Sequence, residues 1–552
     1  MKILLAGVCL TVLAAQAQPH INYRGVVNAA SFAPPGSVGS SIARGSIFSI
    51  FGSNIGPATL AQVSAFPLPA TLAGVSIKIT QGSASVNAIP LIVTANQVNA
   101  IMPSNAPLGL VSIQLTLNGD ISNPGAATVT AATFGTFAIN SAGFGPGVMQ
   151  NFVTPTSQPI NALNVAAAPG QTITLYGTGL GAVPADNVAP TPGNLSTPVD
   201  VFVGGQSAPV LYSGRSPCCS GLDQIVFTVP ANAPLGCYVP VQIRTNQTDL
   251  SNTVTMAVAS SGAACSDARN PIEAAFFNPA KVGLIVLTRA EYYQDVDLVT
   301  PTDSGADLAE ATVRSTPGGG FFFNPAVSLP PIGACLTNTV IGSHSSLALP
   351  DLFGALGAEL DAGPSLTVSG LSQASIPRAA TSPFYGAVLG TNDPVFGAST
   401  LVLKQPGTTT VSTAGGAGVG PLSVSVTAAP AISWTNRLTL SSIDRSQPLP
   451  LTWTPVTTPS NALMIVAGFN YDLPTNTQQS FACSAAAEAG SFAIPSYILR
   501  TLPASRSLVG QSTGMLLLGI IPGQNAVTFS ASGLDTGFAV GISSSSKTVL
   551  FQ

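Results

Sequence analysis

The sequence predicts an all-β protein with two tandem immunoglobulin-like β-sandwiches followed by a larger C-terminal β-sandwich or jelly-roll-like domain. The composition is the first reason: the 552 residues include 55 glycines and 46 prolines, and only 7% of them are charged. Exposed helix faces need charged side chains, so this composition favours short strands separated by turns. The second reason is an internal repeat, and the third is the apolar/polar alternation typical of half-buried strands.

The N-terminal residues have the pattern of a signal peptide. Lys2 is followed by an apolar run over residues 3–15 and by the small-x-small sequence Ala15-Gln16-Ala17, which predicts cleavage after Ala17. A membrane anchor is the alternative. Beyond this segment no apolar run reaches the roughly 18–20 residues that span a bilayer. We therefore expect an exported protein, extracellular, at the cell surface or in the periplasm, with no transmembrane segment in the mature chain.

The charge pattern disfavours nucleic acid as a partner. The formal net charge is -4, and the 17 lysines and arginines are scattered singly along the chain. A protein that binds a phosphate backbone needs a basic stripe or patch. No such patch is present in the sequence.

The repeat is centred on residues 45–56, GSIFSIFGSNIG, which return at 170–181 as GQTITLYGTGLG. All three glycines of the first copy, at 45, 52 and 56, have counterparts 125 positions later. A second match joins residues 97–109 to 224–236 at an offset of 127. An offset that grows only from 125 to 127 indicates duplication. The copies predict modules at 22–139 and 140–259, each about the 100-residue size of an immunoglobulin-like sandwich.

Several strings in the two copies resemble an uncharacterised repeat family of secreted acidobacterial proteins. They are GVVNAASF, GSIFSIFGSNIG, PLPATLAGVSIKI and IPLIVTANQVNAIMP in the first copy and CCSGLDQIVFTVPANAPLGCYVPV in the second. The glycine-turn strand is also similar to IPT/TIG immunoglobulin-like domains. The resemblance covers about residues 23–258. That family has no established catalytic residues, so the resemblance implies an exported β-sandwich module and no chemistry.

The region 265–552 lies beyond the repeat and remains β-patterned. It is predicted to form one large sandwich or jelly-roll-like unit, with a division into two subdomains near 342–364 as the alternative. Apolar runs bounded by Pro, Gly, Ser and Thr predict strands at 283–287, 365–368, 400–404, 422–426, 438–440, 464–467, 515–521 and 527–529, with a closing strand at 547–552.

Six cysteines remain once Cys9 is removed with the signal peptide, and an even number in an exported chain predicts disulfides. They are Cys218, Cys219, Cys237, Cys265, Cys335 and Cys483. Four lie within 218–265, so two local bridges are expected there, leaving Cys335 with Cys483. The sequence does not choose among the fifteen possible pairings. The adjacent pair Cys218-Cys219 is alternatively a redox or metal site, although no CxxC motif or histidine cluster accompanies it.

No catalytic or cofactor-binding residue is predicted. Nucleophilic catalysis by Ser-His-Asp or Cys-His needs an imidazole, and the only histidines are His20, at the mature N-terminus, and His344, in a loop without a GxSxG elbow. A glycosidase needs only two carboxylates, so the 21 acidic residues leave that class open. The glycines of residues 177–183, GTGLGAV, superficially resemble a dinucleotide loop, but the repeat explains them better because no helix pattern follows.

Residues 291–310 hold six of the acidic residues. Oxygen ligands at the spacings DxD and DxxxD suit Ca²⁺, which makes Asp295, Asp297, Asp303 and Asp307 candidate calcium ligands. The more common explanation for such a run is a set of solvated acids on a strand edge. No other metal or cofactor is expected.

Two aromatic features are candidate contact sites. Three glycines at 318–320 precede Phe321, Phe322 and Phe323, and this run predicts either an exposed contact patch for a partner or sugar, or a loop that enters a core strand. Trp434 and Trp453 either stack on a sugar ring or are buried in the sandwich.

These observations support three hypotheses. The first is a secreted or cell-surface, non-enzymatic binding or adhesion protein, whose immunoglobulin-like modules are spacers that present the C-terminal domain to a polysaccharide or protein. The second is a secreted carbohydrate-active hydrolase with its active site in 265–552, and the third is a structural envelope component. Because the chain has few charges, recognition would depend on hydrogen bonds and aromatic contacts and change little with salt.

Overall fold

The computed structural model describes residues 18–37, 39–267, 269–270, 272–294, 302–316, 318–324, 327–341, 357–369, 375–378, 385–392, 400–472, 477–506, 514–522 and 526–552. Within these residues the predicted all-β class is confirmed. Helix is limited there to α1 (Ser496–Leu499) and the 3₁₀ turns η1 (Glu273–Phe276), η2 (Arg437–Thr439) and η4 (Ala487–Ala489). The predicted signal peptide, residues 1–17, lies outside the described residues. None of the described helices has the length and apolar character needed to cross a membrane.

The first module is a sandwich with spatial strand order β1-β3-β7-β6-β5-β8-β10-β2, to which β4 and β9 add at β6 and β8. Its strands are β1 (His20–Asn28), β2 (Ile42–Ala43), β3 (Ile47–Ser53), β4 (Ala61–Gln62), β5 (Val75–Gln81), β6 (Ala84–Val93), β7 (Gln97–Ile101), β8 (Gly109–Leu117), β9 (Asp120–Ile121) and β10 (Gly125–Thr130). One half of β6 pairs with β5 and the other half with β7, so this strand joins the two layers. The predicted alternation is present, since Ile77 and Ile79 are buried while Lys78 between them is exposed.

The second module consists of two separate sheets, β11-β14-β18-β17 with β13 paired to β14, and β12-β21-β19-β15-β16 with β20 paired to β19. The strands are β11 (Gly135–Thr136), β12 (Gly145–Pro146), β13 (Met149–Asn151), β14 (Thr172–Thr178), β15 (Val199–Val203), β16 (Gln206–Ala208), β17 (Val210–Arg215), β18 (Asp223–Thr228), β19 (Gly236–Thr245), β20 (Asp249–Leu250) and β21 (Val254–Val258). Each module has its own apolar core.

The border between the modules lies earlier than the predicted residue 139. Strand β11 pairs with β14 of the second module, and Phe134 belongs to the second core, whereas Val129 closes the first. The sequence repeat could not show this, because β11 lies outside the matching strings.

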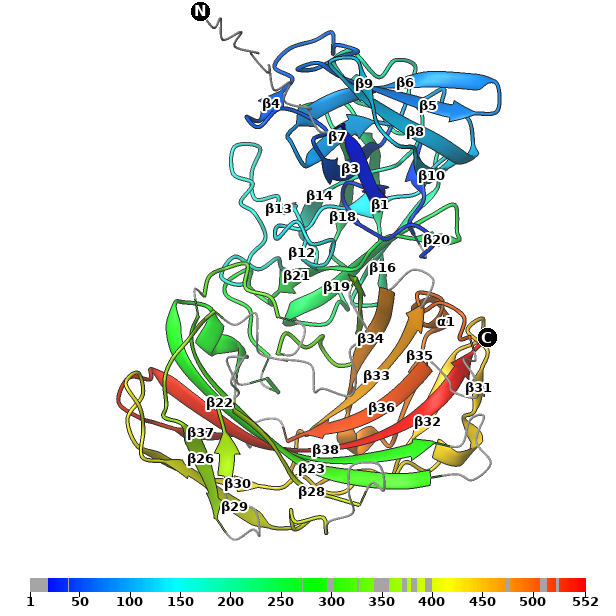
Figure 1. The fold of residues 1–552 in the computed structure, drawn as a ribbon. Coiled ribbons are helices and arrows are strands. Elements are labelled where there is room, and N and C mark those ends of the chain that lie inside the picture. The colour runs from blue at the N-terminus through cyan, green and yellow to red at the C-terminus, as the bar shows by residue number, and fades with distance from the viewer. Residues whose placement is uncertain are drawn as a thin grey trace, which may run out of the picture.

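The C-terminal region is built on one eleven-stranded curved sheet with the order β24-β34-β33-β36-β38-β22-β23-β25, extended by β28 at β23 and by β31 and β37 at β38 (Figure 1). Its strands are β22 (Ala280–Gln294), β23 (Thr302–Thr316), β24 (Cys335–Ile341), β25 (Ala358–Glu359), β28 (Tyr385–Thr391), β31 (Ser442–Ile443), β33 (Leu463–Asp472), β34 (Thr477–Ala486), β36 (Gly514–Ile521), β37 (Val527–Phe529) and β38 (Thr536–Phe551). A four-stranded sheet and a two-stranded pair accompany it, formed by β26 (Ser365–Ser369), β27 (Ser375–Pro377), β29 (Thr408–Thr413) and β30 (Leu422–Thr427), and by β32 (Leu449–Thr452) and β35 (Ser491–Ile494).

Both faces of the large sheet are used. Phe538 and Val540 of β38 lie in an apolar cluster shared with the second module, whereas Ala539, between them, packs toward the four-stranded sheet. Successive side chains of a strand point to opposite faces, so β38, like β22 beside it, contributes side chains to two cores. Figure 1 shows the result, with the second module between the first module and the large sheet.

The large sheet runs across the alternative division of the C-terminal region near 342–364. Strands from before this segment pair with strands from after it, β24 with β34 and β22 with β38. Cys335 and Cys483 lie opposite each other in the first of these pairs and form a disulfide. Long-range pairing of this kind leaves no trace in local sequence, and residues 342–356 lie outside the described part.

Two of the predicted strands are absent. Residues 400–404 form no strand, because the amides of Val402 and Leu403 donate to the Asp307 carboxylate instead of a neighbouring strand. In the segment 438–440, the first two residues belong to the 3₁₀ turn η2 and Leu440 is its C-cap. The apolar character of both segments reflects partial burial of loops.

The cysteines form the three predicted bridges. Cys237–Cys265 and Cys218–Cys219 are the two local disulfides, and Cys335–Cys483 is the long-range one. In the structure the adjacent pair is therefore a disulfide.

Candidate functional site

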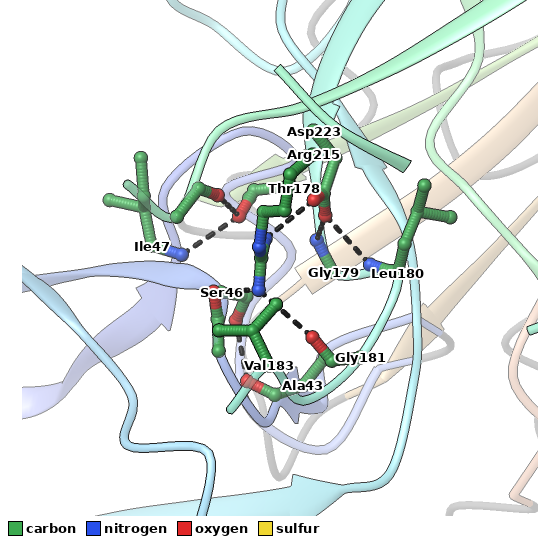
Figure 2. Close-up of polar contacts among 12 residues, drawn as sticks. Ala43, Ser46, Ile47, Thr178, Gly179, Leu180, Gly181, Val183, Arg215 and Asp223 are labelled. Atoms are coloured by element: carbon green, nitrogen blue, oxygen red, sulfur yellow. Dashed lines mark hydrogen bonds and ion pairs between the residues drawn. The ribbon is translucent and has the colours of Figure 1, made fainter. Parts of the chain in front are cut away.

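The joint between the two modules is organised around Arg215, at the end of β17 (Figure 2). Its Nη1 donates to Asp223 Oδ1 at 2.5 Å, and its Nη2 donates to the carbonyls of Gly45 and Gly181 at 2.8 and 2.9 Å. These glycines come from the first and second copies of the repeated segment. The guanidinium, which is 3% exposed, thus bonds to both modules at once.

Asp223 is the counter-ion of Arg215 and is fully buried. Its Oδ2 accepts hydrogen bonds from the amides of Gly179 and Leu180, at 2.7 and 2.8 Å. Burial raises the pKa of Asp223, while Arg215 and the two amides act in the opposite direction. Both carboxylate oxygens and both terminal nitrogens of the guanidinium are thus hydrogen-bonded, whereas Arg215 Nε is buried with no partner among the described residues.

A hydroxyl relay completes this joint. The amide of Ile47 in the first module donates to Thr178 Oγ1 at 2.8 Å, and that hydroxyl donates to the carbonyl of Gly221 at 2.6 Å. Ser104 adds a further link, because its hydroxyl donates to Asp186 and accepts from the amide of Val183. The two modules are therefore fixed by directed bonds rather than joined by a free linker.

The joint between the second module and the C-terminal region is mostly aromatic. Phe323 meets Tyr238 of the second module edge-on at 5.8 Å, and beside this contact the rings of Phe276 and Phe322, both from the C-terminal region, stack with centroids 4.4 Å apart. Phe322 and Phe323 therefore pack into an apolar cluster from a loop and not from the predicted core strand, whereas Phe321 is 39% exposed. Thr253 Oγ1 and Thr337 Oγ1 lie 2.6 Å apart and add a hydrogen bond across this joint.

A cleft of about 320 Å³ lies where all three parts of the chain meet. It is lined by residues of the first module (Ser31, Phe32, Ala33, Pro34, Gly39), of the second module (Ala142, Gly143, Phe144, Leu250, Ser251, Asn252, Thr253) and of the C-terminal region (Thr337, Asn338, Thr339, Gln479, Thr501). None of these lining residues is charged. Domain junctions of this kind, with aromatic walls and a few polar groups, are common places for small-ligand sites.

Phe32 is held in the cleft wall by an unusual backbone. Its φ is +50°, a left-handed conformation that bulky side chains rarely adopt. The turn is held by Asn28, whose Oδ1 accepts from the amides of Ala30 and Ser31, at 2.9 and 3.1 Å. Strained backbone maintained by such a turn is a feature of functional surfaces.

Gln479 provides an unsatisfied polar group in the lining. The side chain is 3% exposed, and its amide oxygen has no hydrogen-bond partner among the described residues. Leaving a buried acceptor unpaired costs roughly 1–3 kcal/mol. Asn252, by contrast, is fully used in the fold, since it bonds to the backbone of Thr136 and Gly143. Gln479 is therefore the lining residue best placed to gain a hydrogen bond from a ligand.

The calcium candidates are not gathered into a site in the described part of the chain. Asp307, on β23, is buried and ion-paired with Arg289, and Asp303 accepts from Arg437 Nη2 at 3.0 Å. Asp295 and Asp297 lie outside the described residues, so their role stays a prediction. Among the described residues, no group of three or more His, Cys, Asp or Glu side chains is placed to hold a metal ion.

The remaining candidates have structural roles or lie elsewhere. Trp434 and Trp453 are buried beside each other across an isolated β-bridge, which confirms the core interpretation. His20 is exposed at the start of β1, and His344 lies outside the described residues. Sequence reasoning missed the cleft, since its lining is discontinuous; only Ser31 and Phe32 fall within a string noted in advance, GVVNAASF.

No protein-family model matches the chain, and no curated protein sequence matches it. Solved structures with some likeness include SGBP-B of the mixed-linkage glucan utilization locus of Bacteroides ovatus, in complex with a mixed-linkage heptasaccharide, at 12% identity, covering 87% of this chain and 97% of that one with a TM-score of 0.14. Surface layer protein SbsC, domains 4–9, has 11% identity, 96% and 65% coverage and a TM-score of 0.18. SGBP-B from a xyloglucan utilization locus of Bacteroides uniformis has 11% identity, 68% and 87% coverage and a TM-score of 0.16. At these TM-scores we draw no function from them.

Proposed function

We propose that the protein is an exported, non-enzymatic binding protein for neutral polysaccharide, and that the cleft at the three-part junction holds the sugar. The observation that carries this proposal is the chemistry of the lining: amide and hydroxyl side chains and two phenylalanine rings, without a charged group. Amides and hydroxyls both donate and accept hydrogen bonds, which suits the hydroxyls of a sugar. The rings of Phe32 and Phe144 offer apolar surface for its C–H faces.

The size of the cleft supports a short stretch of a glycan. About 320 Å³ lies at the lower end of the range for small-ligand sites, enough for about one or two sugar rings. A charged sugar would lose its hydration without gaining a counter-ion in this lining. The ligand we propose is therefore neutral.

The absence of titratable groups in the described lining favours binding over hydrolysis at this cleft. Glycoside hydrolysis needs two carboxyl groups on either side of the scissile bond, and the lining contains none. Export is supported by the three disulfides, which persist in oxidising compartments. In this proposal the immunoglobulin-like modules form walls of the binding site and are more than spacers.

The test is the substitution Gln479→Met, which keeps the side-chain length and removes the amide. We expect the free energy of unfolding to stay the same or rise, because an unpaired buried acceptor is removed. Affinity for the bound polysaccharide should fall by about tenfold, the value of one lost hydrogen bond. Gln158→Met, the same change on an exposed loop of the second module, is the matched control.

Binding is measured by titration calorimetry with soluble neutral β-glucan and galactomannan, and with pectate as the charged comparison. The proposal predicts binding of a neutral glycan whose affinity changes by less than about twofold between low and high salt. Equal glycan affinity in Gln479→Met and in the wild type would rule out the cleft as the binding site. If no neutral glycan binds, the proposed polysaccharide-binding function is ruled out.

A further inference from the structure

The second module contains a disulfide that differs from the other two in its exposure. Cys218 and Cys219 are both exposed, whereas Cys237 and Cys265 are each 2% exposed, Cys335 is 5% exposed and Cys483 is inaccessible. Thiol–disulfide exchange needs an attacking thiolate to reach a sulfur atom, so access largely decides which bridge reacts in the folded protein. Only the Cys218–Cys219 bridge meets this condition among the three.

The exposed bridge lies in the loop that connects the two residues of the buried ion pair. This loop, residues 216–222, runs from Arg215 at the end of β17 to Asp223 at the start of β18. It is closed at its base by a hydrogen bond from the amide of Ser216 to the carbonyl of Leu222, at 3.0 Å. Arg215 and Asp223 also lie opposite each other in the β17–β18 ladder, so the loop closes the hairpin whose last pair is the ion pair.

The same loop contacts the first module directly. Gly221 has a φ of +79°, and a Cβ added there would lie 2.7 Å from Ile47 Cγ1 and 3.3 Å from Ile101 Cγ1. The Gly221 carbonyl also accepts a hydrogen bond from Thr178 Oγ1, and this hydroxyl in turn accepts one from the amide of Ile47. Movement of the loop would therefore disturb the joint through both packing and hydrogen bonds.

We propose that Cys218–Cys219 is a thiol–disulfide exchange site whose substrates are dithiols, and that its reduction loosens the joint between the two modules. A thiolate of the dithiol attacks one sulfur of the bridge, the S–S bond breaks, and a mixed disulfide forms. The second thiol of the dithiol resolves it. The protein gains two electrons and two protons as two cysteine thiols, and the dithiol becomes a disulfide.

Reduction is expected to loosen the joint because the Cys218–Cys219 bridge closes a small covalent ring in the loop. A disulfide between adjacent residues restricts the backbone of both, and reduction returns that conformational freedom to the loop. The Gly221 contacts with Ile47 and Thr178 are then made by a less ordered segment. This inference concerns the joint and does not depend on sugar binding.

The experiment treats the native full chain with dithiothreitol, alkylates it with iodoacetamide and locates the label by peptide mass spectrometry. We expect Cys218 and Cys219 to be labelled at least about tenfold faster than the other four cysteines, which need local opening before they react. Labelling of all six at one rate, or no labelling at 218 and 219 without denaturant, would overturn the exchange site.

The second readout is hydrogen exchange of the Ile47 amide before and after selective reduction. We expect faster exchange after reduction, while the amide of Val466 in β33 stays unchanged. The double variant Cys218→Ser/Cys219→Ser should show the faster Ile47 exchange with and without dithiothreitol. An unchanged Ile47 rate in the selectively reduced wild type would refute the effect on the joint, even if the variant fails to fold.

Discussion

At the residue scale, Arg215 shows how one side chain can fix the relation of two modules. Its guanidinium meets a carboxylate and two backbone carbonyls in fixed directions (Figure 2). An arginine suits this place better than a lysine, because its planar fork presents several donors with defined geometry. The ion pair with Asp223 contributes through this geometry more than through charge attraction, since burial costs both groups their hydration.

Removing one partner of this pair should be strongly destabilising. Asp223→Ala leaves the Arg215 charge buried without a counter-ion and the amides of Gly179 and Leu180 unpaired, so we expect a loss of roughly 3–5 kcal/mol in the free energy of unfolding. Asp200→Ala is the matched control, because Asp200 pairs with Arg244 on the surface of the same module, with side chains 42% and 37% exposed. This control should cost less than about 1 kcal/mol. Urea denaturation measures both, and equal losses would contradict the prediction.

At the scale of the element, the glycine-turn strand explains why the repeat keeps its glycines. The middle glycine of each copy lies where another segment passes closely: a Cβ at Gly52 would be 2.2 Å from the His20 carbonyl oxygen, and one at Gly177 would be 2.3 Å from that of Gly135. In both copies the approaching carbonyl belongs to the strand paired beside it, β1 or β11. The repeated sequence thus encodes a repeated close approach of backbones.

The substitution Gly177→Ala tests this explanation. The added methyl group would collide with the Gly135 carbonyl and the Phe134 ring, so we expect a loss of about 1–3 kcal/mol or more in the free energy of unfolding. Gly193→Ala is the control, because a Cβ there has open space around it. That change should be neutral or slightly stabilising, through the reduced entropy of the unfolded chain. The explanation fails if the two variants have the same urea midpoint.

At the scale of the whole molecule, the C-terminal region depends on its last strand. β38 lies inside the eleven-stranded sheet, antiparallel to β36 on one side and parallel to β22 on the other. It also contributes side chains to three apolar clusters, among them Phe538, Ala539 and Phe551. The region therefore cannot complete its sheet until the end of the chain is available.

Ending the chain at Asp535 should abolish folding of the C-terminal region. We expect its unfolding transition to disappear from differential scanning calorimetry, while the transition of the two modules remains, because each module has its own core. The modules serve as the internal control within the same molecule. A C-terminal transition that persists without β38 would show that the sheet is stable in two halves.

The sequence by itself determined the all-β class, the duplication and the presence of disulfides, because these depend on local alternation, on matching strings and on cysteine count, whereas the pairing of the cysteines came from the structure. It also indicated burial of the tryptophans as the safer interpretation. The predicted strand at 400–404 was wrong because the Asp307 side chain, and not a neighbouring strand, accepts the hydrogen bonds of the Val402 and Leu403 amides.

Only the tertiary structure decided where the modules meet, that one large sheet runs through the C-terminal region, and that a cleft lies among Phe32, Phe144 and Gln479. These residues are separated by 112 and 335 positions, and no periodicity connects them. Their proximity follows from the pairing of β24 with β34 and from the bonds of Arg215 between the modules. Such contacts arise from the packing of whole units, which local sequence patterns do not record.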